Sequence, residues 1–380
     1  MSVDPGRAAL RVLLALEDLV QVLLVAVVRA FGRRQITVLP FLGHGTAQAL
    51  HIRARVVLAG AAADPGAEPV GVDVPPSGWR TLRRSLAQFL TVELPRARVT
   101  VRTPAGETRT RCDRQGYLDL TVDGGGLPPG RHEVTVTASW RGGSTEVSVP
   151  VLVVDTAARF ALISDLDDTV IETGITRGLE FLRLTLLTSV ADRTPLPGAA
   201  ELYRALTGAR GGAPGWPVFY LSTSPWNLYE LLARFMVLRG FPSGPLLLTD
   251  WGPSRTNLLR VTAEQHKLTL IRALLAEHPQ LSVILVGDTG QLDPEIYAAA
   301  AIEAPHRVRA AYLRRTADIS ARRAVEVTAL ARRVVAAGVP MLMVEDSAEI
   351  ARHAAGLGLL DDAEVDLVRA ATTDRFRARQ

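Results

Sequence analysis

Lysine is almost absent from this chain. Of its 43 basic residues, Lys267 alone is a lysine and the other 42 are arginines. Such a skew is typical of a GC-rich genome, because arginine is acceptable at nearly every surface position. A position that keeps lysine is therefore a candidate for needing a compact ammonium group where a planar guanidinium would not fit. Chance retention is the alternative, and composition alone does not dismiss it.

Cysteine and net charge are also scarce. Cys112 is the one cysteine, which excludes an internal disulfide framework and a cysteine-based zinc cluster and favours a reducing, cytoplasmic setting. The net charge of +4 is weak for a nucleic-acid binder, and the basic residues have no interleaved aromatics. We expect a cytoplasmic protein with no nucleic-acid partner.

A long uncharged hydrophobic run is missing as well. Residues 7–29 have a helical pattern with a wide apolar face and a narrow polar stripe. Glu17 and Asp18 interrupt the uncharged run along the chain, so a transmembrane span is disfavoured. No small-residue cleavage site follows, which argues against a signal peptide. We expect residues 1–34 to form an amphipathic helix. It either packs on its own protein or lies peripherally at the inner face of the membrane, with Arg29, Arg33 and Arg34 near the headgroups.

Two hydrophobic patterns divide the rest of the 380 residues. From 35 to 154, short alternating runs are separated by glycine- and proline-containing turns, which predicts a β-sandwich domain of immunoglobulin or transthyretin type. Within it, residues 61–76 read as a mobile loop. From 155 to 380, apolar strands alternate with amphipathic helical stretches, which predicts an α/β domain with a Rossmann-like parallel sheet.

The stretch Phe-Ala-Leu-Ile-Ser-Asp-Leu-Asp-Asp-Thr at 160–169 ends an apolar strand in a cluster of carboxylates. Ligands of open α/β sheets bind beyond the carboxyl ends of the strands. Asp165 and Asp167, two residues apart, face the same side of an extended segment. Their mutual repulsion predicts a cation beside them. The alternative is a turn in which Asp168 or Thr169 caps the next helix.

Three further segments place polar residues at the same kind of position. A second apolar strand at 218–222 ends in Ser222-Thr223-Ser224, whose hydroxyls suit an anion. Lys267 then opens a predicted helix, and a strand at 283–286 is followed by Asp288 and Asp293. Because parallel strands end at one edge of their sheet, we expect these groups to share a site.

In this order the four segments resemble the motifs of the haloacid dehalogenase superfamily of phosphatases, over residues 156 to 361. Ser-Asp-Leu-Asp-Asp-Thr, Tyr-Leu-Ser-Thr-Ser-Pro-Trp-Asn-Leu-Tyr and Gly-Asp-Thr-Gly-Gln-Leu-Asp-Pro-Glu-Ile-Tyr are similar to the yeast actin-patch phosphatidate phosphatase family and its bacterial relatives, distant cousins of the lipins. The resemblance implies a haloacid dehalogenase-like fold and a Mg²⁺-dependent hydrolase of lipid metabolism. Its reaction would convert phosphatidate to diacylglycerol and phosphate.

The resemblance also implies roles for single residues. Asp165 attacks phosphorus and forms an aspartyl-phosphate, and Asp167 protonates the leaving alcohol and later takes a proton from water. Lys267, Ser222 and Thr223 bind the phosphoryl oxygens and offset the charge that develops on them.

Magnesium is the cofactor that the resemblance implies. Its ligands are Asp165, the backbone carbonyl of Asp167, and Asp288, with Asp293 as support or a further ligand. Two of the assigned residues keep structural alternatives. Asp293, followed by proline, also fits the start of a helix, and Thr223, like Ser224, also fits a capping role.

Three other positions have functional and structural interpretations. His266 invites a catalytic role, but a helix-start or core histidine is favoured. The segment 250–252 either contacts substrate or is a plain loop. Asp346 follows the last predicted strand, and we interpret it as a helix cap.

Other functions stay open on the sequence alone. One is a phosphatase of a soluble phosphomonoester; the interval between Thr169 and Val218 shows no large cap domain, which mildly favours a bulky or membrane-borne phosphate. A second is a module that binds phosphatidate without hydrolysing it, and a third is a phosphoacceptor switch. The presence of both Asp165 and Asp167 argues for turnover against these two.

Overall fold

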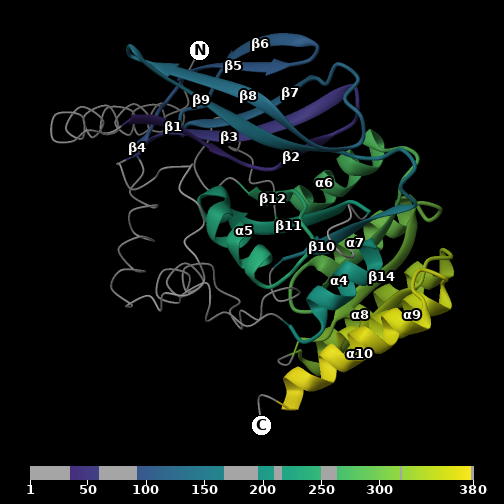
Figure 1. Cartoon of the computed structure of the whole chain (residues 1–380). Coiled ribbons are helices and arrows are strands. Elements are labelled where there is room, and N and C mark those ends of the chain that lie inside the picture. Colours follow the sequence, from purple (N-terminus) through teal and green to yellow (C-terminus); the bar gives the residue numbers. More distant parts are fainter. Residues whose placement is uncertain are drawn as a thin grey trace, which may run out of the picture. The chain divides into compact units, whose positions relative to one another are not determined.

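The structure is a computed structural model that describes residues 35–59, 92–166, 196–208, 216–249, 263–316 and 319–377. The helix expected over 1–34, the loop expected at 61–76, the segment 250–252 and Asp167 to Thr169 lie outside these ranges. The chain divides into two compact units after Val153, and Figure 1 labels most of their elements.

The first unit is built from β-strands. They are β1 (Gln35–Pro40), β2 (Gly43–Gly45), β3 (Ala49–Ala59), β4 (Val92–Glu93), β5 (Arg98–Thr103), β6 (Gly106–Arg111), β7 (Tyr117–Asp123), β8 (Gly130–Trp140) and β9 (Gly143–Val153). Their order is β1-β3-β2-β9-β8-β5-β6, and β4 and β7 also pair with β3. The sheet is mixed, because β2 runs parallel to β9 whereas β3, β5 and β8 pair antiparallel with their neighbours.

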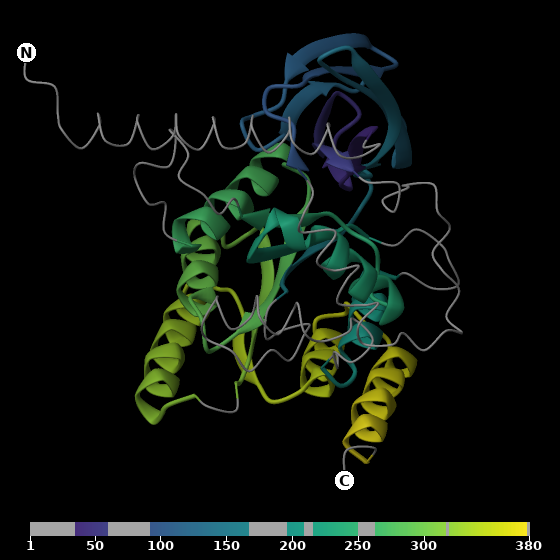
Figure 2. The same ribbon diagram turned by 90° about the vertical axis from the view of Figure 1, so that its left-hand side faces the viewer.

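This arrangement confirms a β domain and refines the expected sandwich. Hydrogen bonds connect all nine strands into one sheet, because β3 is long enough to pair with β1 and β2 along one edge and with β7 and β4 along the other. Alternate residues such as Val134, Val136 and Ala138 are buried in a single cluster. A sheet can bury one face on itself only by curling, as Figure 2 shows.

The second unit contains a sheet in which every strand pair is parallel. Its strands are β10 (Phe160–Asp165), β11 (Val218–Pro225), β12 (Leu246–Thr249), β13 (Ser282–Asp288), β14 (Val308–Arg314) and β15 (Met341–Val344), in the order β12-β11-β10-β13-β14-β15. The predicted parallel α/β domain is therefore confirmed. All six residues of β10 are buried, as expected for a central strand with both faces covered.

Helices cover the two faces of this sheet (Figure 2). They are α4 (Ala199–Thr207), η2 (Trp226–Leu228), α5 (Tyr229–Leu238), α6 (Ala263–Glu277), α7 (Asp293–Glu303), α8 (Ala321–Ala336), α9 (Ser347–Gly356) and α10 (Asp362–Arg377). Helices α6, α7 and α8 bury their apolar residues with Ile163 and Leu285. On the opposite face, Tyr203 of α4 reaches Ser164, and Tyr312 of β14 contacts His353 of α9.

Candidate active site

The site lies where the strand order reverses. From β10 the chain continues through β11 and β12 on one side and then returns to β13, β14 and β15 on the other. Crevices at such a reversal, outside the carboxyl ends of the strands, are the usual ligand sites of open α/β sheets. Asp165 ends β10 and Asp288 ends β13, and the two strands are hydrogen-bonded neighbours.

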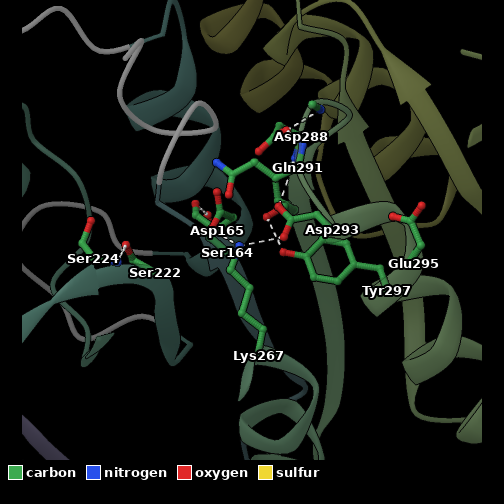
Figure 3. Close-up of polar contacts among 12 residues, drawn as sticks. Ser164, Asp165, Ser222, Ser224, Lys267, Asp288, Gln291, Asp293, Glu295 and Tyr297 are labelled. Carbon is green, nitrogen blue, oxygen red and sulfur yellow. Dashed lines mark hydrogen bonds and ion pairs between the residues drawn. The ribbon is translucent and has the colours of Figure 1, made fainter. Parts of the chain in front are cut away.

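Lys267 joins two of the predicted carboxylates. Its Nζ lies 2.5 Å from Oδ1 of Asp165 and 2.8 Å from Oδ1 of Asp293, and all three side chains are buried. Figure 3 shows the lysine extending from α6 into this cluster. Burial lowers the pKa of Lys267, but the charges of Asp165 and Asp293 outweigh that effect, so its pKa is raised and the side chain is an ammonium.

Asp288 completes a group of three acids. Ligand atoms of Asp165, Asp288 and Asp293 all lie within 4.8 Å of one another. Oδ1 of Asp288 accepts hydrogen bonds from the amides of Gly290 (2.5 Å) and Gln291 (2.9 Å). Its Oδ2 is buried and has no hydrogen-bond partner among the described residues. Burial, followed by the repulsion of Asp293, raises the pKa of Asp288 to about 7.

Gly287 lets Asp293 approach the strand. A Cβ atom at this position would lie 2.4 Å from Oδ2 of Asp293 and 2.7 Å from Cε2 of Tyr297, closer than real Cβ contacts. The same Oδ2 accepts a hydrogen bond of 3.3 Å from the Asp288 amide. The glycine before Asp288 is thus required by packing, and it brings the first turn of α7 against the end of β13.

Sequence reasoning missed two side chains beneath Asp165. The Ser164 hydroxyl donates to the backbone carbonyl of Asp165 (2.6 Å), and the Tyr203 hydroxyl lies 2.6 Å from the same Ser164 oxygen. Burial raises the pKa of Tyr203, which keeps its hydroxyl protonated. Ser164 stands directly before Asp165 in the motif, which is a usable signal. Tyr203 comes from α4 and carries no sequence signal of its own.

Arg323 is a third residue that the sequence did not indicate. It donates to the carbonyl oxygens of Thr289 (3.2 Å) and Gln291 (2.6 Å), and it forms a two-point ion pair with Glu295 of α7. The loop between Asp288 and α7 is thereby held from α8. Nothing local marks Arg323, because it is one of many arginines in the chain and acts on a loop about 30 residues earlier.

The predicted hydroxyl residues lie in the last part of β11, the other neighbour of β10. Ser222 and Ser224 are buried, and Thr223 is half-buried. The Ser224 amide donates to Oγ of Ser222 (2.9 Å). The capping alternative for Thr223 and Ser224 stays a prediction, because the accepting hydroxyl is that of Ser222. In Figure 3 Ser222 and Ser224 lie to the left of the carboxylate cluster and are separated from it.

The structure thus brings Asp165, Lys267, Asp288 and Asp293 together. Asp293 also begins α7 with proline after it, which confirms the helix-start interpretation. Its role beside a metal stays a prediction. His266 lies in the first turns of α6, as expected for a helix-start histidine. Asp346 caps α9, where its side chain accepts from the Glu349 amide, as predicted.

These features define the second unit as an α/β domain with an acidic site at the carboxyl edge of a parallel sheet. Residues 160–315 match the family described as Phosphatidate phosphatase APP1, catalytic domain. The resemblance predicted from the motifs is therefore confirmed.

Two proteins from yeasts show the same relation. Phosphatidate phosphatase APP1 of Saccharomyces cerevisiae (strain ATCC 204508 / S288c) is 28% identical over 153 residues. An uncharacterized protein of Schizosaccharomyces pombe (strain 972 / ATCC 24843) is 26% identical over 155 residues. Each match covers 40% of this chain and spans only 25% of the length of the relative.

Two solved structures show only a distant likeness to this chain. The match to a putative alpha-galactosidase/melibiase from Bacteroides fragilis NCTC 9343 covers 86% of this chain and 56% of the length of that protein, at 10% identity and a TM-score of 0.23. The beta-glucuronidase 3 of Bacteroides uniformis covers 78% of this chain and 37% of its own, at 8% identity and a TM-score of 0.21. Among the described helices, none is long and apolar enough to cross a membrane.

Proposed function

We propose that this protein is a Mg²⁺-dependent phosphatidate phosphatase that hydrolyses phosphatidate to diacylglycerol and phosphate. The observation that carries the proposal is the buried cluster of three carboxylates around one ammonium. The match of residues 160–315 to a phosphatidate phosphatase catalytic domain supports the same chemistry. The particular substrate rests on that family match.

The charges of the cluster favour a divalent cation. With Asp165, Asp288 and Asp293 ionised, one ammonium leaves two negative charges uncompensated in a buried site, which is costly. Oδ2 of Asp288, without a hydrogen-bond partner among the described residues, is available as a ligand atom. An all-carboxylate donor set suits Mg²⁺, which prefers oxygen. When bound, the ion would reduce the repulsion between the nucleophile and an anionic substrate.

The nucleophile in this proposal is Asp165. One carboxylate oxygen attacks phosphorus as the bond from phosphorus to the alcohol oxygen breaks, which gives an aspartyl-phosphate and releases diacylglycerol. Asp167, which lies outside the described residues, gives its proton to the departing oxygen. In the second half, Asp167 takes a proton from water as the water oxygen attacks phosphorus. Phosphate leaves and the Asp165 carboxylate is restored.

Lys267 has two tasks in this scheme. Its ammonium holds Asp165 and Asp293 in place before substrate binds, and it offsets charge on the phosphoryl oxygens as that charge develops. The Ser222 hydroxyl, at the end of the neighbouring strand, and the adjacent Thr223 are the proposed hydrogen-bond donors to the same oxygens. The Ser164–Tyr203 pair fixes the backbone at Asp165 from the far side of the sheet.

The test is release of phosphate from phosphatidate in detergent micelles, beside a water-soluble phosphomonoester in the same assay. Wild-type protein should require Mg²⁺ and lose activity in chelator, and Asp165→Asn should be inactive. Asp346→Asn is the matched control, because Asp346 also follows a strand of this sheet but caps α9. If wild type and Asp165→Asn were equally inert on both substrates, the enzyme proposal would be wrong. If the enzyme hydrolysed the soluble phosphomonoester in preference to phosphatidate, the proposed substrate would be a soluble ester and not the lipid.

A further inference from the structure

The outer face of the β5–β6 hairpin carries an unbalanced group of arginines. Arg98 of β5 lies directly opposite Arg111 of β6, and on its other side Arg98 is opposite Ser139 of β8. Arg109 of β6 is opposite Thr100. The three arginines are exposed, whereas Val99 and Val101, which alternate with them along β5, are buried in the core. The arginines therefore share the solvent face of the sheet.

Like charges directly opposite each other on a sheet are destabilising. Farther along the same two strands, Arg102 is opposite Glu107 and forms a 2.9 Å ion pair with it. Arg109 makes only a longer contact of 3.4 Å to that glutamate. Arg98 and Arg111 have no ion-pair partner among the described residues. One end of the hairpin is thus balanced in charge, and the other keeps an energetic conflict, which is where functional sites are expected.

A cleft of about 420 Å³ lies at this unbalanced end, and its lining includes Arg98, Arg109, Arg111, Thr100 and Ser139. Guanidinium groups bind phosphate oxygens through paired N–H donors, and neighbouring hydroxyl groups add single hydrogen bonds. The chemistry of the lining therefore fits a phosphate group. Because the cleft opens on the exposed face of a sheet, it suits phosphates presented by a surface better than an enclosed small molecule.

We propose that this cleft, the Arg98–Arg109–Arg111 site, binds the phosphate groups of anionic phospholipids and brings the β unit onto a membrane surface. The choice of a lipid as the source of the phosphate rests on the proposed function, which requires the protein to reach a substrate held in a bilayer. Arginines near an anionic surface each add substantially to membrane affinity, within a Debye length of the lipid.

The experiment is co-sedimentation of the full chain with two kinds of vesicle. One is phosphatidylcholine alone, and the other contains about one fifth phosphatidate. Chelator is present throughout, so that binding is measured without turnover. The variant is Arg98→Gln/Arg111→Gln, and the control is Arg332→Gln/Arg333→Gln, which removes the same charge from two exposed arginines of α8.

Wild type and the α8 control should bind phosphatidate vesicles alike, and the site variant should bind roughly thirtyfold more weakly, as two arginines near an anionic surface predict. The site variant should also melt at the same or a higher temperature than wild type, because the repulsion between Arg98 and Arg111 is relieved. An equal loss of vesicle binding in the site variant and the α8 control would overturn the proposal. So would wild-type binding to phosphatidylcholine vesicles that equals its binding to phosphatidate vesicles.

Two further measurements are needed. One distinguishes a lipid phosphate from free phosphate as the ligand, and the other distinguishes failure of this site from failure of the proposed enzymatic function. Inorganic phosphate that binds at these arginines in the absence of vesicles, with no vesicle binding, would make the site a free-phosphate site and overturn the lipid proposal. Hydrolysis of a soluble phosphomonoester should be equal in wild type and in the site variant. If no phosphomonoester is hydrolysed while vesicle binding still depends on Arg98 and Arg111, the proposed function fails and this site stands.

Discussion

Nζ of Lys267 lies 2.5 Å from Oδ1 of Asp165, so the single lysine of the chain pairs with the carboxylate that ends the central strand β10. The lysine is 3% exposed and also reaches Asp293. A point-like ammonium can contact two converging carboxylates in so small a space, whereas a planar guanidinium needs more room and a fixed fork geometry. The retention of lysine in an arginine-rich chain thus has a structural reason.

Lys267→Arg should therefore lower kcat for phosphate release by about a hundredfold or more, the loss typical of removing one transition-state contact. Arg272→Lys, a substitution on the exposed part of the same helix, should leave kcat unchanged because Arg272 pairs, among the described residues, with Glu303 alone. Steady-state phosphate release from both variants makes the comparison. Full activity in Lys267→Arg would show that the site does not require a lysine at this position.

Lys267→Met separates a structural role from a chemical one. It leaves Asp165 and Asp293 buried without their ammonium, and removal of one partner of a buried ion pair costs about 3–5 kcal/mol. Unfolding in denaturant without metal should show that loss, and added Mg²⁺ should recover part of it. A free energy of unfolding equal to wild type would contradict the ion pair as described.

Asp288→Asn should have opposite effects on stability and function. The asparagine oxygen still accepts from the amides of Gly290 and Gln291, and the change removes a buried charge next to Asp293. In chelator at neutral pH the variant should melt at the same or a higher temperature than wild type. It should no longer be stabilised by Mg²⁺ and should release no phosphate. Thermal shift with and without Mg²⁺ measures both effects, and retained Mg²⁺ stabilisation would remove Asp288 from the metal site.

Most of the second unit could be predicted from the sequence because its signals are local. Runs such as Val283 to Val286 are apolar throughout, as strands covered on both faces are, and each ends in a polar residue that marks the sheet edge. The strand β12 was not predicted, although the short apolar run Leu246 to Leu248 is followed by the polar residues Thr249 and Asp250. In the first unit, alternation indicated strands but not their connection into one sheet, because register and pairing are long-range properties.

The residues of the site also fall into those that the sequence predicted and those that it did not. Asp165, Lys267, Asp288 and Asp293 were found because each belongs to a motif with a fixed place at a strand end or helix start. Tyr203 was not found, because it comes from α4 and reaches Ser164 of β10 only through tertiary packing. A hydrogen bond between residues so far apart in the chain leaves no periodic or compositional trace in a single sequence.

Cys112 gives a pH-dependent prediction for the first unit. Burial raises the pKa of its thiol to about 11 from an ordinary value of 9.0, and Sγ lies 3.2 Å from the Leu94 carbonyl. Since the unfolded thiol ionises first, this contribution to stability is complete below pH 9 and is lost as pH rises toward 11. Relative to Cys112→Ala, wild type should lose roughly 1 kcal/mol between pH 8 and pH 10.

Denaturant unfolding of the two proteins at both pH values provides the measurement, and comparing them cancels the titration of all other groups. A thiol reagent at pH 8 should react with Cys112 only after unfolding. A stability difference that stays constant with pH would show that the thiol is not shielded in the folded protein.

Arg323→Gln should weaken Mg²⁺ binding without an unusual loss of stability. Arg323 holds the carbonyls of Thr289 and Gln291, and the amides of that loop orient the Asp288 carboxylate. Loss of such support around a metal ligand typically costs about 10- to 100-fold in metal affinity. Arg272→Gln is the matched control, since Arg272 makes the same two-point pair with Glu303 of α7 but touches no part of the loop.

Titration of Mg²⁺ by thermal shift should give a midpoint at least about tenfold higher for Arg323→Gln than for Arg272→Gln, while the melting temperatures of the two variants in chelator stay similar. Arg323→Lys should restore only part of the affinity, because an ammonium lacks the fork that reaches Glu295 and both carbonyls together. Equal Mg²⁺ midpoints in the two glutamine variants would mean that the loop keeps Asp288 in place without Arg323, and the arginine would then serve only to pair α8 with α7.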